Sequence, residues 1–174
     1  MRRCGGALML AISMLAFAAT GGAAASRTEV RAVLHGRAIP VSRVHHLHCH
    51  DGARPTIRCF RSEAARDRDA QRLSRSPVVG RRGGDSVAVT YYVTVWEHIN
   101  YAGASFAFSA PNTNLGWIGW NDCISSFKSV GASHPKFWEH ADYGGTGWQW
   151  VIGAWVATVG SGANDQWSSL KNVP

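Results

Sequence analysis

The sequence lacks several features that would assign it to a familiar functional class. It has one apolar run, which is short and lies near the N-terminus, so a membrane protein with several spans is disfavoured. The nucleophile-elbow, H-E-x-x-H and Cys–His–Asn signatures of hydrolases are missing, which argues against an enzyme. No long apolar stripe with a helical period is present, and this absence favours a fold built from strands.

Charge and aromatic residues are distributed unevenly along the chain. The 174 residues carry 18 Lys and Arg against 11 Asp and Glu, a formal net charge of +7. Residues 26–87 hold 13 arginines and six acids, whereas residues 88–174 hold three lysines, five acids and all eight tryptophans. A basic domain that grips phosphates over a wide face is therefore disfavoured, and we expect no nucleic-acid partner.

Residues 1–25 have the layout of a secretory signal peptide. Arg2 and Arg3 precede an apolar core over residues 7–20, and small residues follow up to Ala25. A spanning helix needs about 20 apolar residues, and this core is shorter. We therefore expect cleavage, a secreted extracellular protein, and no membrane span after cleavage.

Few cysteines remain after such cleavage. Cys4 precedes the apolar core, so the mature chain keeps Cys49, Cys59 and Cys123. An odd number permits at most one intramolecular pair. The Cys49–Cys59 disulfide is the favoured pair and leaves Cys123 as a lone thiol, but a pairing of Cys123 with either upstream cysteine stays open.

The Arg/His-rich segment 26–87 is poor in large apolar residues. It buries too little surface to offset chain entropy, so we expect it to be largely irregular and flexible. A short solvated helix is possible over residues 62–74, with Ser62 as its N-cap, and residues 78–85 resemble a linker.

Histidines cluster around the first cysteine of that segment. His45, His46, His48 and His50 next to Cys49 could bind zinc or copper by ligand type. Their spacing matches no structural zinc pattern. The favoured interpretation is an exposed His-rich loop closed by the disulfide.

The last half of the chain contains an internal repeat. Residues 95–106 match residues 137–148 at an offset of 42, with Trp, Glu, His, Tyr and Gly recurring. Residues 121–126 match residues 164–169 at an offset of 43, as N-D-C-I-S-S and N-D-Q-W-S-S. A repeat of this length indicates two copies of one supersecondary unit.

Each copy has the composition of short β-strands separated by glycine turns. Residues 87–95 are β-branched and aromatic, residues 105–109 alternate with period two, and residues 148–152 and 154–159 are strand-like. We expect an all-β domain over residues 88–174, in which two Greek keys, at about 92–131 and 135–174, pack as a sandwich.

Two motifs occur in the same order in both copies and resemble the βγ-crystallin family in its microbial calcium-binding form. The first is aromatic-x4-aromatic-x-Gly, and the second is N/D-N/D-x-x-S/T-S. The resemblance covers about residues 90–174. The first motif reads as a structural aromatic corner at a tight hairpin, with glycine where positive φ is needed. Its residues are Trp96, Tyr101 and Gly103, and Trp138, Tyr143 and Gly145.

The resemblance implies two Ca²⁺ sites, each taking oxygens from both repeats. Hydroxyls, carboxylates and carbonyls are the hard ligands that calcium prefers. The implied ligands are the side chains of Asp122, Ser125, Asp165 and Ser168 and the backbone carbonyls of Cys123 and Gln166. Supporting roles fall to Asn121, Ser126, Asn164 and Ser169, and carbonyls near Glu97 and Glu139 complete the shells.

Alternatives to a non-catalytic calcium-binding module follow from the same fold. The family's fold resembles that of secreted protease inhibitors and killer toxins, so a secreted protease is a possible partner. A His–Glu pair exists at His98 and Glu97, but repeated residues more often serve the repeat's structure. A cell-surface glycan is a further possible partner, because tryptophans can stack on sugars. The candidates are Trp117, Trp120, Trp148, Trp150 and Trp155.

Overall fold

The computed structural model describes residues 30–75, 89–131 and 134–174. The predicted signal peptide and the predicted linker lie outside the described residues. The described part is mostly β-sheet, as the alternation of the sequence predicts, and no helix within it is long and apolar enough to cross a membrane.

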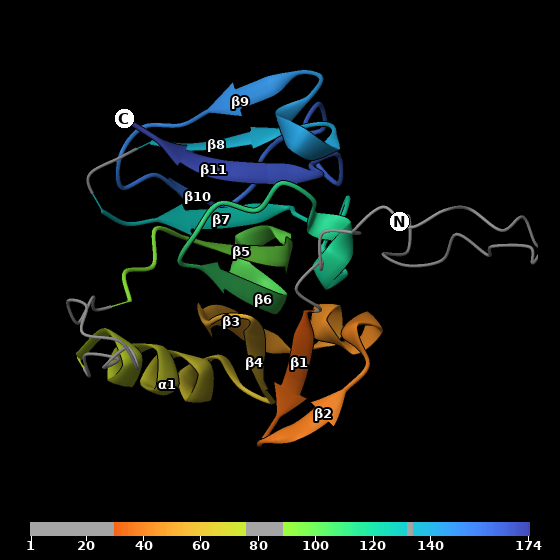
Figure 1. The fold of residues 1–174 in the computed structure, drawn as a ribbon. Helices are drawn as coiled ribbons and strands as arrows, with labels where there is room; N and C mark the ends of the chain where they lie inside the picture. Colours follow the sequence, from red (N-terminus) through yellow and green to blue (C-terminus); the bar gives the residue numbers. More distant parts are fainter. Residues whose placement is uncertain (1–29, 76–88, 132–133) are drawn as a thin grey trace, which may run out of the picture.

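Eleven strands in the described part of the chain form two sheets (Figure 1). The larger has the order β10-β7-β5-β6-β3-β4-β1-β2 and the smaller has the order β11-β8-β9. The strands of the first repeat are β5 (Val93–His98), β6 (Ala102–Phe108) and β7 (Ser126–Ser129). Those of the second are β8 (His134–Trp138), β9 (Gly147–Gln149), β10 (Trp155–Val156) and β11 (Ser169–Val173).

One strand of the second repeat crosses to the sheet of the first. β10 pairs with β7, with Trp155 opposite Lys128, while β8, β9 and β11 stay in the smaller sheet. Exchange of a strand between two stacked sheets is how Greek keys interlock. Residues 150–152, expected to be strand, instead lead into a turn, because Gly153 at φ 68° reverses the chain there.

The core lies between the two sheets and is dominated by aromatic side chains. Phe137 stacks on Trp167 with ring centroids 4.0 Å apart, and Phe127 lies 5.0 Å from Phe137. All three rings are fully buried. These contacts join the repeats into one hydrophobic core, as expected for units that cannot bury their apolar faces alone.

The structure corrects the prediction of a largely irregular segment before the repeats. The strands are β1 (Arg31–Leu34), β2 (Arg37–Ile39), β3 (His48–Ala53) and β4 (Thr56–Phe60). The 3₁₀ helix η1 (Val41–His46) precedes β3, and helix α1 (Glu63–Arg75) follows β4. The amide of Ala65 lies 3.4 Å from the Ser62 hydroxyl, in the geometry of an N-cap.

This N-terminal unit, residues 30–75, folds because it shares its core and its sheet with the repeats. β3 pairs in parallel with β6, with Cys49 opposite Phe106, so the larger sheet runs without a break from one unit into the other (Figure 1). The few apolar side chains of the segment, such as Val44 and Ile57, are buried in that joint core. The segment alone is too polar to fold, but it adds its strands to an existing sheet.

Cysteine pairing follows the favoured prediction in part. Cys49 and Cys59 lie opposite each other on β3 and β4 and form a disulfide. Both are buried. Cys123 is also disulfide-bonded, so the expectation of a lone thiol at that position is wrong.

Candidate functional site

The two hairpin corners have the same geometry in both repeats. Trp96 and Tyr101 lie 5.4 Å apart edge to face, and Trp138 and Tyr143 lie 5.0 Å apart. Gly103 follows the first pair at φ 79°, where a side chain would clash with the His98 ring at 2.8 Å. Each corner therefore needs glycine at this point, as the sequence pattern predicts.

In each repeat, a buried serine forms hydrogen bonds that hold the hairpin corner against the motif loop. The Ser126 hydroxyl donates to the carbonyl of His98 at 2.6 Å and accepts from the amide of Tyr101 at 3.1 Å. Ser169 makes the equivalent pair of bonds in the second repeat, to His140 and Tyr143. The last serine of each N/D-N/D-x-x-S/T-S motif thus has a structural position inside the protein.

The two motif loops pair with each other across an approximate twofold axis. The Asp122 amide donates to the carbonyl of Trp167 at 3.1 Å, and the Asp165 amide donates to the carbonyl of Ile124 at 3.3 Å. Both aspartates have positive φ, 54° and 55°. This backbone conformation is rare outside glycine and asparagine. The line along which the loops 121–126 and 164–169 meet is called the seam, and the Asp165 carboxylate reaches across it to Ser125.

Oxygens from both repeats converge at one end of this seam. The Ser125 hydroxyl donates to the backbone carbonyl of Glu97 at 2.8 Å, and it lies 3.4 Å from Oδ1 of Asp165. A carbonyl, a hydroxyl and a carboxylate from three distant segments thus share one small region. Their types are those of the ligands implied for the first site.

The other end of the seam contains the matching residues of the opposite repeat. Ser168 occupies the position of Ser125, with its amide bonded to Trp138 as that of Ser125 is bonded to Trp96. Asp122 is the carboxylate at this end. The backbone positions of Asp122 and Ser168 thus match those of Asp165 and Ser125, but among the described residues no hydrogen bond joins the Ser168 hydroxyl to Asp122 as one joins Ser125 to Asp165.

Electrostatics at the seam disfavour ionised carboxylates in the absence of a cation. Burial and then the Asp165 carboxylate raise the pKa of Asp122, with His140 opposing. Burial is also the largest cause of the raised pKa of Asp165, ahead of the opposing hydrogen bonds from Ser125 and Asn164. No Lys or Arg in the described part of the chain forms an ion pair with either carboxylate.

The remaining predicted site residues take less central positions. The side-chain Nδ2 of Asn121 donates to Oδ2 of Asp122 at 2.7 Å, so it orients that carboxylate. Glu139 accepts through its side chain from the Thr146 amide at 3.3 Å. Cys123 and Gln166 lie in the loops between the aspartates and serines, Cys123 buried and Gln166 half-buried.

The donor set at the seam could hold a hard divalent cation but not a soft one. Across residues 30–75, 89–131 and 134–174, no group of three or more His, Cys, Asp or Glu side chains could hold a metal ion. A site at the seam must therefore use hydroxyl and carbonyl oxygens beside each single carboxylate. Such a mixture suits Ca²⁺, which takes six to eight oxygens in flexible geometry.

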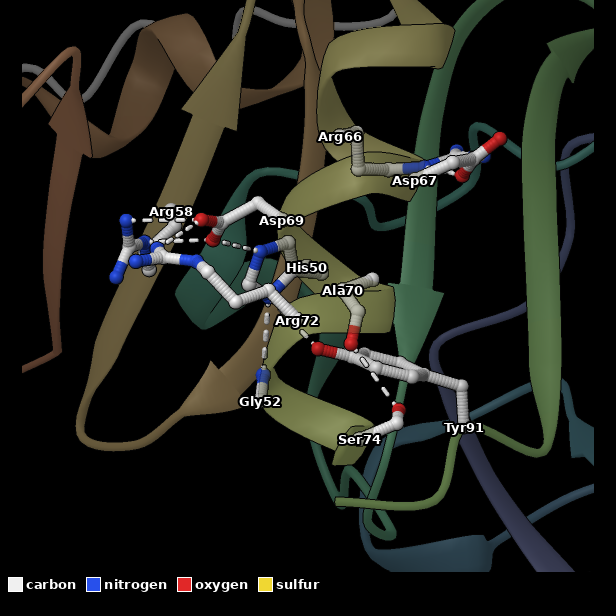
Figure 2. Close-up of polar contacts among 10 residues, drawn as sticks. All are labelled: His50, Gly52, Arg58, Arg66, Asp67, Asp69, Ala70, Arg72, Ser74 and Tyr91. Carbon is white, nitrogen blue, oxygen red and sulfur yellow. Dashed lines mark hydrogen bonds and ion pairs between the residues drawn. The ribbon is translucent and has the colours of Figure 1, made fainter. Parts of the chain in front are cut away.

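The histidines expected in an exposed loop lie instead on η1 and β3, and one of them, His50, is fully buried in a polar network (Figure 2). Nε2 of His50 donates to Asp69 at 3.0 Å. Its Nδ1 accepts from the Gly52 amide at 3.3 Å and from the Tyr91 hydroxyl at 3.0 Å. Because a backbone amide can only donate, this ring is neutral with its proton on Nε2.

Two arginines complete this network around Asp69. Arg58 and Arg72 both pair with the Asp69 carboxylate, which holds its pKa below the usual value against the cost of burial. Burial also lowers the pKa of His50. Sequence reasoning missed this network, since its members are spread over residues 50–91 and no local pattern links them.

Comparisons with known proteins find similarity in the half of the chain that contains the repeat. A model described as peptidase inhibitor family I36 matches residues 82–151. No curated protein matches the chain. Among solved structures, an archaeal βγ-crystallin is 29% identical, covering 48% of this chain and 99% of that chain, with a TM-score of 0.43.

Bacterial βγ-crystallin domains are similar as well. A double mutant of the domain from Clostridium beijerinckii is 34% identical over 48% of this chain and 97% of that chain, with a TM-score of 0.42. A domain from Flavobacterium johnsoniae is 23% identical over 47% of this chain and 93% of that chain, also with a TM-score of 0.42. The 34% identity to the Clostridium beijerinckii domain, with 97% of that domain covered, together with the two aromatic corners and the two paired motif loops, places the C-terminal half of this chain in the βγ-crystallin family.

Proposed function

We propose that the protein is a secreted, non-catalytic module that binds two Ca²⁺ ions in the seam between its repeats. The observation that carries the proposal is the convergence of the Ser125 hydroxyl, the Glu97 carbonyl and the Asp165 carboxylate from three segments. Export is inferred from the layout of residues 1–25 and agrees with the Cys49–Cys59 disulfide, which persists in oxidising compartments.

Each ion would be held by both repeats. The first site would use Glu97, Ser125 and Asp165, and the second would use Glu139, Ser168 and Asp122, with carbonyls of Cys123 and Gln166 and water filling the shells. A bound cation would offset the burial and the Asp165 charge that together raise the pKa of Asp122. Binding would therefore stabilise a seam that is electrostatically unfavourable without it.

The expected affinity is modest because each site has one carboxylate. Extracellular calcium modules have dissociation constants of roughly 10⁻⁴ to 10⁻³ M. At a hundredfold excess of free calcium over the dissociation constant, binding stabilises the native state by about 2.7 kcal/mol. A calcium-dependent rise in melting temperature is thus the expected signature.

The structure contains a Ser–His pair, Ser105 and His48, but a substrate cannot reach it, which argues against catalysis there. Nδ1 of His48 lies 2.8 Å from the Ser105 hydroxyl, which resembles an activated nucleophile. Ser105 is fully buried, and the Arg66 guanidinium donates to the same oxygen. A substrate could reach this hydroxyl only if helix α1 separated from strand β6.

Calorimetric titration with calcium tests the proposal. Asp165→Asn should remove binding at the first site and reduce the calcium-dependent rise in melting temperature. Asp142→Asn is the matched control, since Asp142 has φ 55°, lies outside the motif loops and matches Asn100 of the first repeat. Equal titrations for wild type and Asp165→Asn, or an equal loss in the control, would remove the ligand assignment.

A second candidate function is inhibition of a secreted peptidase. The match to peptidase inhibitor family I36 over residues 82–151 favours it. The structure offers a suitable surface in the turn over residues 151–154. Val151 and Ile152 are 68% and 49% exposed at this turn, an unusual position for two aliphatic side chains.

The turn is held rigidly at both ends. Before it, the Trp150 amide donates to Pro135 at 3.0 Å, and the Trp150 ring packs on Phe127. After it, the carbonyl of buried Ala154 accepts from the Ser129 amide at 2.8 Å. A preorganised loop loses little entropy when it enters a protease cleft, so this turn could present its side chains as a substrate-like ligand.

Assays of the purified mature protein against secreted serine, cysteine and metallo-endopeptidases test this second candidate. Ile152→Asp should abolish inhibition of any peptidase that the wild type inhibits. Ile99→Asp changes an equally exposed isoleucine, 52% against 49%, outside the turn and should leave inhibition intact. Absence of inhibition across the panel, or equal loss in both variants, would reject the turn as an inhibitory surface.

A further inference from the structure

A cavity of about 550 Å³ lies between the N-terminal unit and the repeats. One wall is the turn from β3 to β4, and the other is the segment around η3 (Leu115–Ile118). The volume falls within the range of about 300–1,000 Å³ that is typical of small-ligand sites. Because residues 51–57 build half of it, a βγ-crystallin domain alone would lack this cavity.

One side of the cavity is apolar and ends in an exposed indole. Ile57, Phe106 and Ile118 form the buried part, and Trp117 is 52% exposed at the rim. The backbone under Trp117 is fixed, because the Asn114 side chain caps η3 by accepting from the Gly116 amide at 2.8 Å. A tryptophan held in this way offers a flat apolar face to a ligand at little entropic cost.

The other side is polar but electrically balanced. Arg54 pairs with buried Asp51 at 2.6 Å, and the second oxygen of Asp51 accepts from the Ser109 amide at 2.7 Å. The guanidinium of Arg54 is half exposed, and its Nη1 has no partner among the described residues. Asn112 and Thr113 also line the cavity, and although Oδ1 of Asn112 already accepts from the Asn114 amide at 2.9 Å, both residues carry further polar groups.

These features exclude two common ligand classes. An anion finds no uncompensated charge, because Asp51 already neutralises Arg54. An extended peptide finds no free strand edge. The backbone of Asn112 is paired in both directions with Leu170, and the carbonyl of Pro111 accepts from Arg54. The ligand must be neutral, with one apolar face and a rim of hydrogen-bonding groups.

We propose that this cavity binds a neutral saccharide, with a pyranose ring stacked on Trp117. A pyranose has an apolar face of C–H groups and a rim of hydroxyls. Its apolar face would lie on the indole, and its hydroxyls would reach Arg54, Asn112 and Thr113. This site is separate from the seam between the motif loops and does not depend on calcium.

Calorimetry of the mature protein with cello-, chito-, xylo- and malto-tetraose, with and without chelator, tests the proposal. At least one tetraose should bind in both conditions. Trp117→Ala should weaken that binding about tenfold, a loss of about 1.4 kcal/mol, because the stacked ring would no longer be present. Trp155→Ala is the matched control, because Trp155 is 69% exposed and lies outside the cavity, and it should bind as the wild type does.

Three results would overturn the site. The first is no binding by any tetraose. The second is equal affinity in Trp117→Ala and wild type, with melting temperatures showing that both are folded. The third is binding of octanoate but not of the sugars, which would identify an apolar anion pocket. Thr113→Val, which removes a hydroxyl from a lining residue and keeps the Asn112 and Asn114 hydrogen bonds under Trp117, should weaken sugar binding even if Trp117→Ala proves unstable.

Discussion

The hydroxyl of Ser125 lies 3.4 Å from Oδ1 of Asp165, although the two residues are forty positions apart and belong to different repeats. The contact exists because the motif loops pair through their backbones and both aspartates adopt positive φ. A cation ligand set divided between repeats can form only when both repeats are folded. Calcium binding and the packing of the repeats are therefore expected to be coupled.

In the absence of calcium, Asp165→Asn should not destabilise the protein. The folded state raises the pKa of Asp165, chiefly by burial, so the folded state favours the protonated carboxyl. Calcium-free stability should thus be higher at pH values below the ordinary pKa of 3.8 and decrease as pH rises through the raised value. Asparagine lacks this titration, so the stability difference between variant and wild type should shift toward the variant as pH rises. Chemical denaturation in chelator between about pH 4 and pH 7 measures it, and a variant that is less stable at neutral pH would contradict the prediction.

The buried His50 should make the protein less stable as the medium becomes acidic. Burial lowers its pKa from the ordinary value of 6.5, so below that value the unfolded chain takes up a proton before the folded one does. Stability should then fall as pH decreases from 6.5 toward the lowered value. The charges that face the ring are Asp69, Asp51, Arg58 and Arg72, with the Tyr91 hydroxyl beside them.

Comparison of the wild type with His50→Gln isolates this effect. The variant should show a smaller loss of stability between about pH 6.5 and pH 5. His46→Gln is the control, because His46 is exposed and adjacent to the same strand. Identical stability–pH profiles for wild type and His50→Gln would show that protonation of the His50 ring does not contribute to the loss of stability in acid.

Loss of the Cys49–Cys59 disulfide should lower the free energy of unfolding. The bridge closes a loop of ten residues between β3 and β4. Cross-linking a loop of this length stabilises a protein by about 2–3 kcal/mol in the chain-entropy model. The Cys49→Ala, Cys59→Ala double variant should show this loss in urea denaturation, and a change below about 0.5 kcal/mol would contradict it.

Arg66 should be essential for the contact between α1 and the repeats. Its guanidinium is buried, donates to Ser105 on β6 and lies 5.9 Å from the centre of the Trp96 ring. Arg66→Met keeps the aliphatic stem but removes the hydrogen bonds, which should cost about 1–3 kcal/mol.

The matched control for that variant is Arg68→Met on the exposed side of the same helix. It should change stability by less than about 0.5 kcal/mol. If the two substitutions cost the same amount in urea denaturation, the contact of Arg66 with β6 does not contribute to docking of the helix.

The two Greek keys could be predicted because the sequence contains two copies of the same pattern. The offset of 42 residues aligns Trp96 with Trp138 and Gly103 with Gly145, so each copy supports the assignment of the other. The strand over residues 150–152 could not be predicted correctly. Its apolar residues suggest a buried strand, but Gly153 turns the chain and leaves Val151 and Ile152 exposed.

The N-terminal unit could not be predicted because its stability is not local. Val44 and Ile57 are too few to form a core, and their burial depends on β6, which follows about fifty residues later. Asp69 was missed for another reason: two of its partners, His50 and Arg58, lie 19 and 11 residues away on β3 and β4. Polar networks of this kind leave no periodic signal in the sequence.

The most direct test of the central claim is a crystal structure of the protein grown with calcium, with anomalous scattering to locate the ions. We expect one peak at about 2.3–2.6 Å from the Ser125 hydroxyl, Oδ1 of Asp165 and the Glu97 carbonyl, and a second beside Ser168 and Asp122. Well-ordered motif loops without a peak at either position would contradict the account.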